Sequence, residues 1–124
     1  MLTKIQVNNV KKLISRLRRM GAIQHFYVSD AGLPKFCVVG HALHLAGVSI
    51  AHLRDGSIVE YSLHDKYGFE EYDRHAIITS NDEPDYLDET DMERGARMAD
   101  YLLKWLQDRW GKEPRTVSSR QGTE

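Results

Sequence analysis

The sequence predicts a mainly α-helical fold, a compact bundle of four to five helices that leaves room for one short β-hairpin. Two amphipathic segments, one near each end of the chain, indicate long helices because their apolar residues recur every three to four positions. Each segment opens with a capping-box pattern, Thr3 with Gln6 and Thr90 with Glu93. Between them, apolar runs that end at a glycine predict shorter helices.

The first helix should span residues 3–20 and end at Gly21, where a glycine can adopt the left-handed C-cap conformation. Residues 22–30 are rich in aromatic and β-branched side chains and should form a short extended stretch. A largely buried helix is expected at 36–46. Gly40 inside it costs about 1 kcal/mol relative to alanine, which suggests close packing against another element.

The middle of the chain allows two interpretations. Asp55-Gly56 is a turn signal that could close a hairpin between residues 50–53 and 57–61. We favour instead a loop that leads to a helix at 59–67, followed by another short helix at 69–78. The last helix should begin near Thr90 and turn these side chains inward: Met92, Ala96, Ala99, Leu102, Leu103, Trp105, Leu106 and Trp110.

Length and composition indicate one domain. The chain has 124 residues, of which 41% are hydrophobic and 28% charged, as in ordinary globular proteins. We assign residues 1–111 to a single globular helical domain and residues 112–124, which are almost free of apolar side chains, to a disordered C-terminal tail. The sequence contains no long apolar run and no secretory signal, so we expect a cytoplasmic protein without a membrane partner.

The charge balance argues against nucleic acid as a partner held by bulk electrostatics. Seventeen Lys and Arg stand against eighteen Asp and Glu, which gives a net charge of -1. Five cations lie late in the first helix, and we interpret them as a solvated face whose positive charge suits the negative end of the helix dipole. In the alternative interpretation they contact phosphate or an acidic partner. These cations are Lys11, Lys12, Arg16, Arg18 and Arg19.

Cys37, His41 and His44 form the most suggestive chemical group. Their spacing of four and then three residues places them on one stripe of the helix predicted at 36–46. Zinc prefers cysteine and histidine ligands, so the stripe is a candidate zinc site, with a water or one of His25, His52, His64 and His75 as the fourth ligand. In a second interpretation Cys37 is a nucleophile, activated by the helix N-terminus and served by a histidine base. We favour a third, in which the stripe is packed and binds no cofactor.

Asn81 and Asp82 lie between an apolar pair and the start of the last helix. We place them in a turn, where their side chains accept hydrogen bonds from backbone N–H groups and act structurally. In the alternative interpretation Asp82 is a general base or metal ligand beside His75.

Two of these segments together resemble a known family. Residues 37–43 have the form CxxGxAL at a helix start, and Asn81-Asp82 follows downstream, an order that resembles a family of small domains of bacteria and their phages over about residues 36–106. No activity is established for that family. The resemblance implies only architecture, a cysteine packed at a helix start and an Asn-Asp pair that caps or braces the last helix. The chain departs from the family pattern at His41 and Ser80.

The sequence lacks a complete catalytic set, a phosphate-binding loop and a paired-cysteine zinc pattern. We therefore predict a small soluble accessory or interaction protein, in keeping with a phage or mobile-element origin, with an unidentified protein as its partner. One alternative is a Cys/His-dependent enzyme or zinc-binding domain that uses Cys37, His41 and His44. The other is a phage-encoded inhibitor of a host defence system.

Overall fold

The computed structural model describes residues 2–25, 27–29, 32–55, 61–82 and 88–110. These residues form six helices, which confirms the mainly helical fold. They are α1 (Lys4–Met20), α2 (Val38–Leu45), α3 (Ile50–Asp55), α4 (Tyr61–Tyr67), α5 (Glu71–Asp82) and α6 (Asp91–Trp110). None of the described helices combines the length and the apolar character that crossing a lipid bilayer requires.

The extended structure expected from the sequence is largely replaced by loop and helix. Within the stretch predicted at 22–30, the described residues 22–25 and 27–29 contribute only an isolated antiparallel bridge between Val28 and Phe36. The alternative hairpin is wrong because residues 50–53, its first arm, lie within α3 (Ile50–Asp55). Residues 111–124 lie outside the described part of the chain, so the tail assignment stays a prediction.

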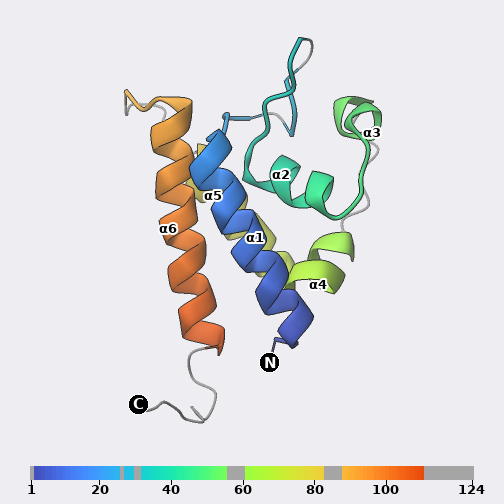
Figure 1. Cartoon of the computed structure of the whole chain (residues 1–124), viewed down its shortest axis with the longest axis vertical. Coiled ribbons are helices and arrows are strands. Elements are labelled where there is room, and N and C mark those ends of the chain that lie inside the picture. Colours follow the sequence, from blue (N-terminus) through green and yellow to red (C-terminus); the bar gives the residue numbers. More distant parts are fainter. Residues whose placement is uncertain (1, 26, 30–31, 56–60, 83–87, 111–124) are drawn as a thin grey trace.

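The helices α1 and α6 are the longest of the described elements and lie side by side in opposite directions (Figure 1). The buried face of α1 includes Val10, Leu13 and Leu17, and that of α6 includes Met98 and Leu102. Burial of each such side chain contributes about 1.5–3 kcal/mol, so this helix pair forms the largest part of the core. The shorter helices α2, α4 and α5 complete it, with α2 and α4 against α1 and α5 against α2 and α6.

Both predicted capping boxes are present. At the start of α1 the Thr3 hydroxyl accepts the N–H of Gln6 at 3.1 Å, and the Gln6 side chain accepts the N–H of Thr3 at 2.9 Å. Thr90 and Glu93 make the same pair of bonds at the start of α6, at 3.1 and 2.8 Å. These reciprocal bonds satisfy N–H groups that the first turn of a helix leaves without a partner.

Two close backbone approaches fix how the elements meet. A Cβ atom on Gly40 would overlap the carbonyl oxygen of Tyr27, which confirms the close packing predicted for that glycine. A Cβ atom on Gly95 of α6 would lie 2.5 Å from the Cα atom of Gly21 at the end of α1. The two long helices therefore touch backbone to backbone, and neither contact leaves space for a side chain.

The buried face of α6 differs from the predicted one. Met92, Ala96, Leu103 and Trp110 are exposed, whereas Arg94 and Gly95 are buried. The face of α6 that packs against α1 is therefore rotated from the predicted one. Gly95 has no side chain, so the end of α1 can approach its backbone, and the guanidinium of Arg94 donates to the carbonyl oxygen of Ala22 at 3.0 Å.

Candidate functional site

Arg16 on α1 is the centre of the region that holds the predicted histidines. Its Nε donates to Nδ1 of His41 at 3.0 Å, and its Nη2 lies 2.8 Å from Nδ1 of His44. Nε2 of His41 lies 2.8 Å from the carbonyl oxygen of Gly21, so the imidazole proton belongs on Nε2. The ring of Phe36 covers the group, with centroid distances of 5.0 Å to both imidazoles and 5.1 Å to the guanidinium.

Both histidines are held in the neutral form. Burial, reinforced by the charge of Arg16, lowers the pKa of His41 to about 4 and also lowers the pKa of His44. A neutral imidazole offers one nitrogen as an acceptor, which the guanidinium of Arg16 uses on each ring. Arg16 is thus bonded to two uncharged groups, and these bonds leave its positive charge uncompensated.

Cys37 stands apart from the two histidines. It is the N-cap of α2 rather than a residue within it, and its Sγ accepts the N–H of Gly40 at 3.3 Å. Burial raises the pKa of the Cys37 thiol to about 11, so the reactive thiolate is scarce at neutral pH. The described residues contain no group of three His, Cys, Asp or Glu side chains placed to hold a metal ion. Zinc binding and thiol chemistry at Cys37, His41 and His44 stay predictions.

Asn81 and Asp82 lie in the last turn of α5, so their predicted position in a turn is wrong. Nδ2 of Asn81 donates to the carbonyl oxygen of Ile23 at 3.0 Å, and Oδ1 of Asp82 accepts the N–H of His25 at 3.0 Å. These bonds attach the loop after α1 to α5. The same loop is also bonded to α6, because Arg94 donates to the carbonyl oxygen of Ala22. The contacts support the structural interpretation of the pair.

The imidazole beside Asp82 belongs to His25, whose Nδ1 lies 3.7 Å from Oδ2 of Asp82. His75 is exposed and lies about two helical turns away on α5. His25 adopts a φ of 69°, a left-handed conformation that L-residues seldom take. The hydrogen bond from its N–H to Asp82 holds this conformation, so the loop is positioned by α5.

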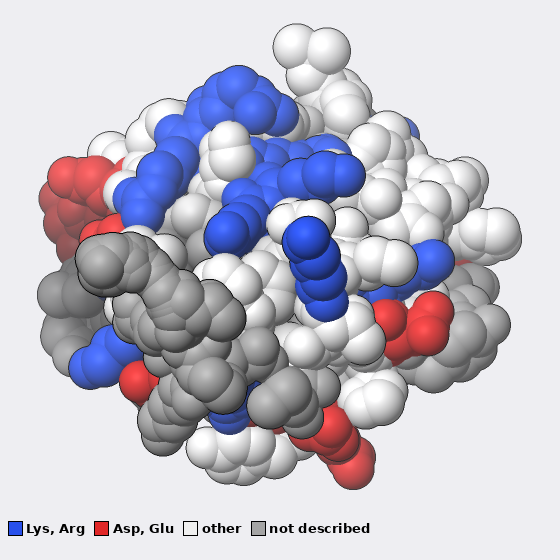
Figure 2. Space-filling model, turned by 60° about the horizontal axis from the view of Figure 1, so that its bottom comes forward, with Lys and Arg blue, Asp and Glu red and all other residues white. Residues whose placement is uncertain are grey.

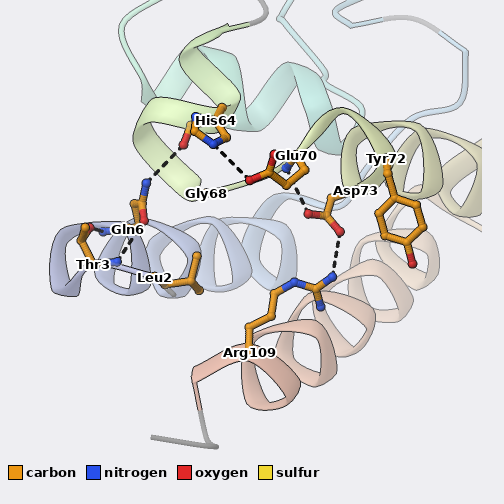
Figure 3. A pocket seen from close by; sticks show the side chains of 9 residues that line it. All are labelled: Leu2, Thr3, Gln6, His64, Gly68, Glu70, Tyr72, Asp73 and Arg109. Carbon is orange, nitrogen blue, oxygen red and sulfur yellow. Dashed lines mark hydrogen bonds and ion pairs between the residues drawn. The ribbon is translucent and has the colours of Figure 1, made fainter.

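A groove that the sequence did not predict runs beside α5 and α6. Two hollows of about 560 and 360 Å³ meet at Tyr72, Asp73 and Arg109, and we call them together the Arg109 groove. The first hollow is also lined by Gln6, His64 and Glu70 from α1, α4 and the loop before α5 (Figure 3). The second is lined by Tyr101 and Lys104 among others.

Asp73 and Arg109 form the bridge between the two hollows. Asp73 is 3% exposed, and its Oδ1 accepts Nη2 of Arg109 at 2.9 Å and Nε1 of Trp105 at 3.1 Å. Its Oδ2 accepts the N–H of Glu70 at 3.0 Å. The guanidinium of Arg109 also lies 4.5 Å from the ring centroid of Trp105. Asp73 is therefore fully bonded, and it holds Arg109 in one position at the groove (Figure 3).

Lysine and arginine side chains gather on one face of the molecule (Figure 2). The helix α1 carries six Lys and Arg and no Asp or Glu. Two of these cations have partners on α6, since Arg18 pairs with Asp100 at 3.0 Å and Lys11 lies 5.0 Å from the ring centroid of Trp110. The cations of α1 thus form a basic face on a protein whose total charge is close to zero.

Comparison with known proteins gives no match to a family model, to a curated protein or to a solved structure. The resemblance to small domains of bacteria and phages therefore stays a prediction.

Proposed function

We propose that this protein is a small accessory protein that acts by binding another protein, and that the Arg109 groove receives part of that partner. The observation that carries the proposal is the composition of the groove. Tyr72, at 74% exposed, stands at its edge beside the fixed guanidinium of Arg109, with Tyr101 beyond it. Tyrosine, tryptophan and arginine are the residue types that contribute most to binding at protein interfaces.

The shape of the groove supports a polypeptide ligand. The two hollows share Tyr72, Asp73 and Arg109 in their linings, so a ligand that fills both must contact these residues. An extended segment of chain has that form. Because Arg109 is already held by Asp73 and Trp105, binding does not have to immobilise a long side chain, which lowers the entropic cost of association.

Affinity purification from the lysate of the native host, followed by mass spectrometry, tests the proposal. Wild-type protein should retain a partner in stoichiometric amount, and Tyr72→Ala with Tyr101→Ala should lose it. Leu103→Ala is the matched control, because Leu103 is an exposed α6 side chain that does not line the groove. Retention of the same partner by the double tyrosine variant would contradict the proposal. The identity of the partner would also decide whether the protein inhibits a host defence system.

A further inference from the structure

A third hollow, of about 390 Å³, lies where α1, the end of α2 and α4 meet. Its lining includes two lysines, Lys12 and Lys66, and contains no carboxylate. Two aliphatic side chains stand at it, Ile5 at 72% exposed and Leu45 at 40% exposed. We call this surface the basic hollow. Exposed aliphatic groups are costly to leave in water, and where they lie together they mark a surface that a partner covers.

The charge around the basic hollow continues along α1. Lys12, Arg16 and Arg19 are spaced by four and three residues, so they form one stripe that runs about 10 Å from the hollow toward the end of the helix. Arg16 within this stripe is bonded to imidazoles and not to carboxylates. The stripe therefore presents an electrostatic field that a negatively charged ligand would neutralise.

From this arrangement we infer that the basic hollow binds an acidic segment of a protein that also carries aliphatic side chains. The carboxylates of the segment pair with Lys12, Lys66 and Arg19, and an aliphatic side chain covers Ile5 and Leu45. The inference stands apart from the Arg109 groove, which neither lysine lines.

A nucleic acid fits this surface less well. A phosphate backbone would pair with the lysines but would leave Ile5 and Leu45 in water. Base stacking needs an exposed aromatic ring, and the aromatic residue in the lining, Tyr67, is buried with its hydroxyl bonded to the carbonyl oxygen of Ala42.

Fluorescence anisotropy with three labelled probes tests the inference on the full chain at low ionic strength. The probes are a peptide that alternates glutamate and leucine, an oligoglutamate and an oligothymidine of the same charge. We expect the Glu-Leu peptide to bind most tightly. Lys12→Glu with Lys66→Glu should weaken it about tenfold or more, because charges at a partly enclosed site then repel. Ile5→Ser should weaken it several-fold, because the apolar contact is lost while the charge is kept.

Matched controls separate this site from general charge attraction and from the Arg109 groove. Lys104→Glu reverses one lysine charge in that groove, half the charge change of the double variant, and should leave peptide binding unchanged, as should Tyr72→Ala. Circular dichroism of each variant should match the wild type, since all these side chains are exposed. Equal or tighter binding of oligothymidine, equal binding of oligoglutamate, or equal loss in Lys104→Glu would overturn the inference.

Discussion

Arg16 and Arg109 are two partly buried arginines that each lie against an aromatic ring, yet the molecule holds them in opposite ways. Arg16 is bonded to two neutral imidazoles beneath Phe36, and Arg109 is bonded to a buried carboxylate beside Trp105. The first arrangement keeps a net positive charge at the surface of α1, whereas the second neutralises its charge inside the fold. The choice of partner thus decides whether an arginine contributes to an external field or to internal cohesion.

The largest difference between the Arg16 and Arg109 regions should appear when the carboxylate of Asp73 is removed. Asp73→Ala leaves the Arg109 guanidinium and the Trp105 N–H without their acceptor, so the free energy of unfolding should fall by about 3–5 kcal/mol. Urea denaturation followed by circular dichroism measures this loss. The exposed Asp108→Ala on α6, the helix of Arg109 and Trp105, is the control and should change stability by less than about 0.5 kcal/mol. Similar values for both variants would mean that the bridge does not stabilise the fold.

Acid should act on the Arg16 region through His41. The pKa of His41 in the folded protein, about 4, lies below its ordinary value of 6.5, so between these values the unfolded chain binds the proton more readily. The stabilisation is therefore complete above pH 6.5 and is lost as the pH falls toward 4. When the pH falls from 7 to 5, protonation of His41 in the unfolded chain should lower the free energy of unfolding by about 2 kcal/mol.

Urea denaturation of the wild type and of His41→Gln, each at pH 7 and at pH 5, isolates this contribution. Glutamine can accept from Arg16 and donate to Gly21 as His41 does, but it does not titrate. The loss between pH 7 and pH 5 should shrink in the variant. An identical loss in both proteins would assign the acid sensitivity to other groups.

Replacement of each arginine by lysine should sharpen the comparison further. Arg16→Lys cannot reach two imidazole acceptors as the planar guanidinium does, so it should cost about 1–2 kcal/mol. Arg109→Lys can still place one ammonium near Asp73 and should cost less, about 1 kcal/mol. Thermal melts of the two variants provide the measurement. A larger loss in Arg109→Lys would reverse the expected order.

The smallest effect should come from a chelator. His41 and His44 direct ring nitrogens at Arg16, and Cys37 directs its sulfur at its own helix, so EDTA should leave the melting temperature unchanged. Elemental analysis of the dialysed protein accompanies the melt. One zinc per chain together with a chelator-sensitive melt would show that the imidazoles turn from Arg16 to a metal.

Features set by neighbouring residues could be predicted from the sequence. The capping boxes at Thr3 and Thr90 placed the starts of both long helices, and Gly21 marked the end of α1. Asn81 and Asp82 were placed in a turn because their side chains favour one locally. In the structure they extend α5 because they are bonded to Ile23 and His25, a preference that local patterns do not contain.

The sites themselves depend on contacts between distant parts of the chain. The shared face of His41 and His44 was evident from their spacing, but Arg16 lies 25 and 28 residues away. Asp73 and Arg109 are 36 residues apart. A spacing of four residues puts Trp105 and Arg109 on one face of the last helix. It could not indicate which carboxylate would meet them.

The backbone contact between Gly21 and Gly95 also constrains how the chain is made. The Arg94 guanidinium that reinforces it bonds to Ala22, 72 residues earlier, and the apolar face of α1 is buried largely by α6. A ribosome therefore releases α1 well before the helix that covers it has been synthesised. Until then the nascent chain exposes Val10, Leu13 and Leu17 to water, and chaperones that bind apolar segments can bind these residues before α6 has been made.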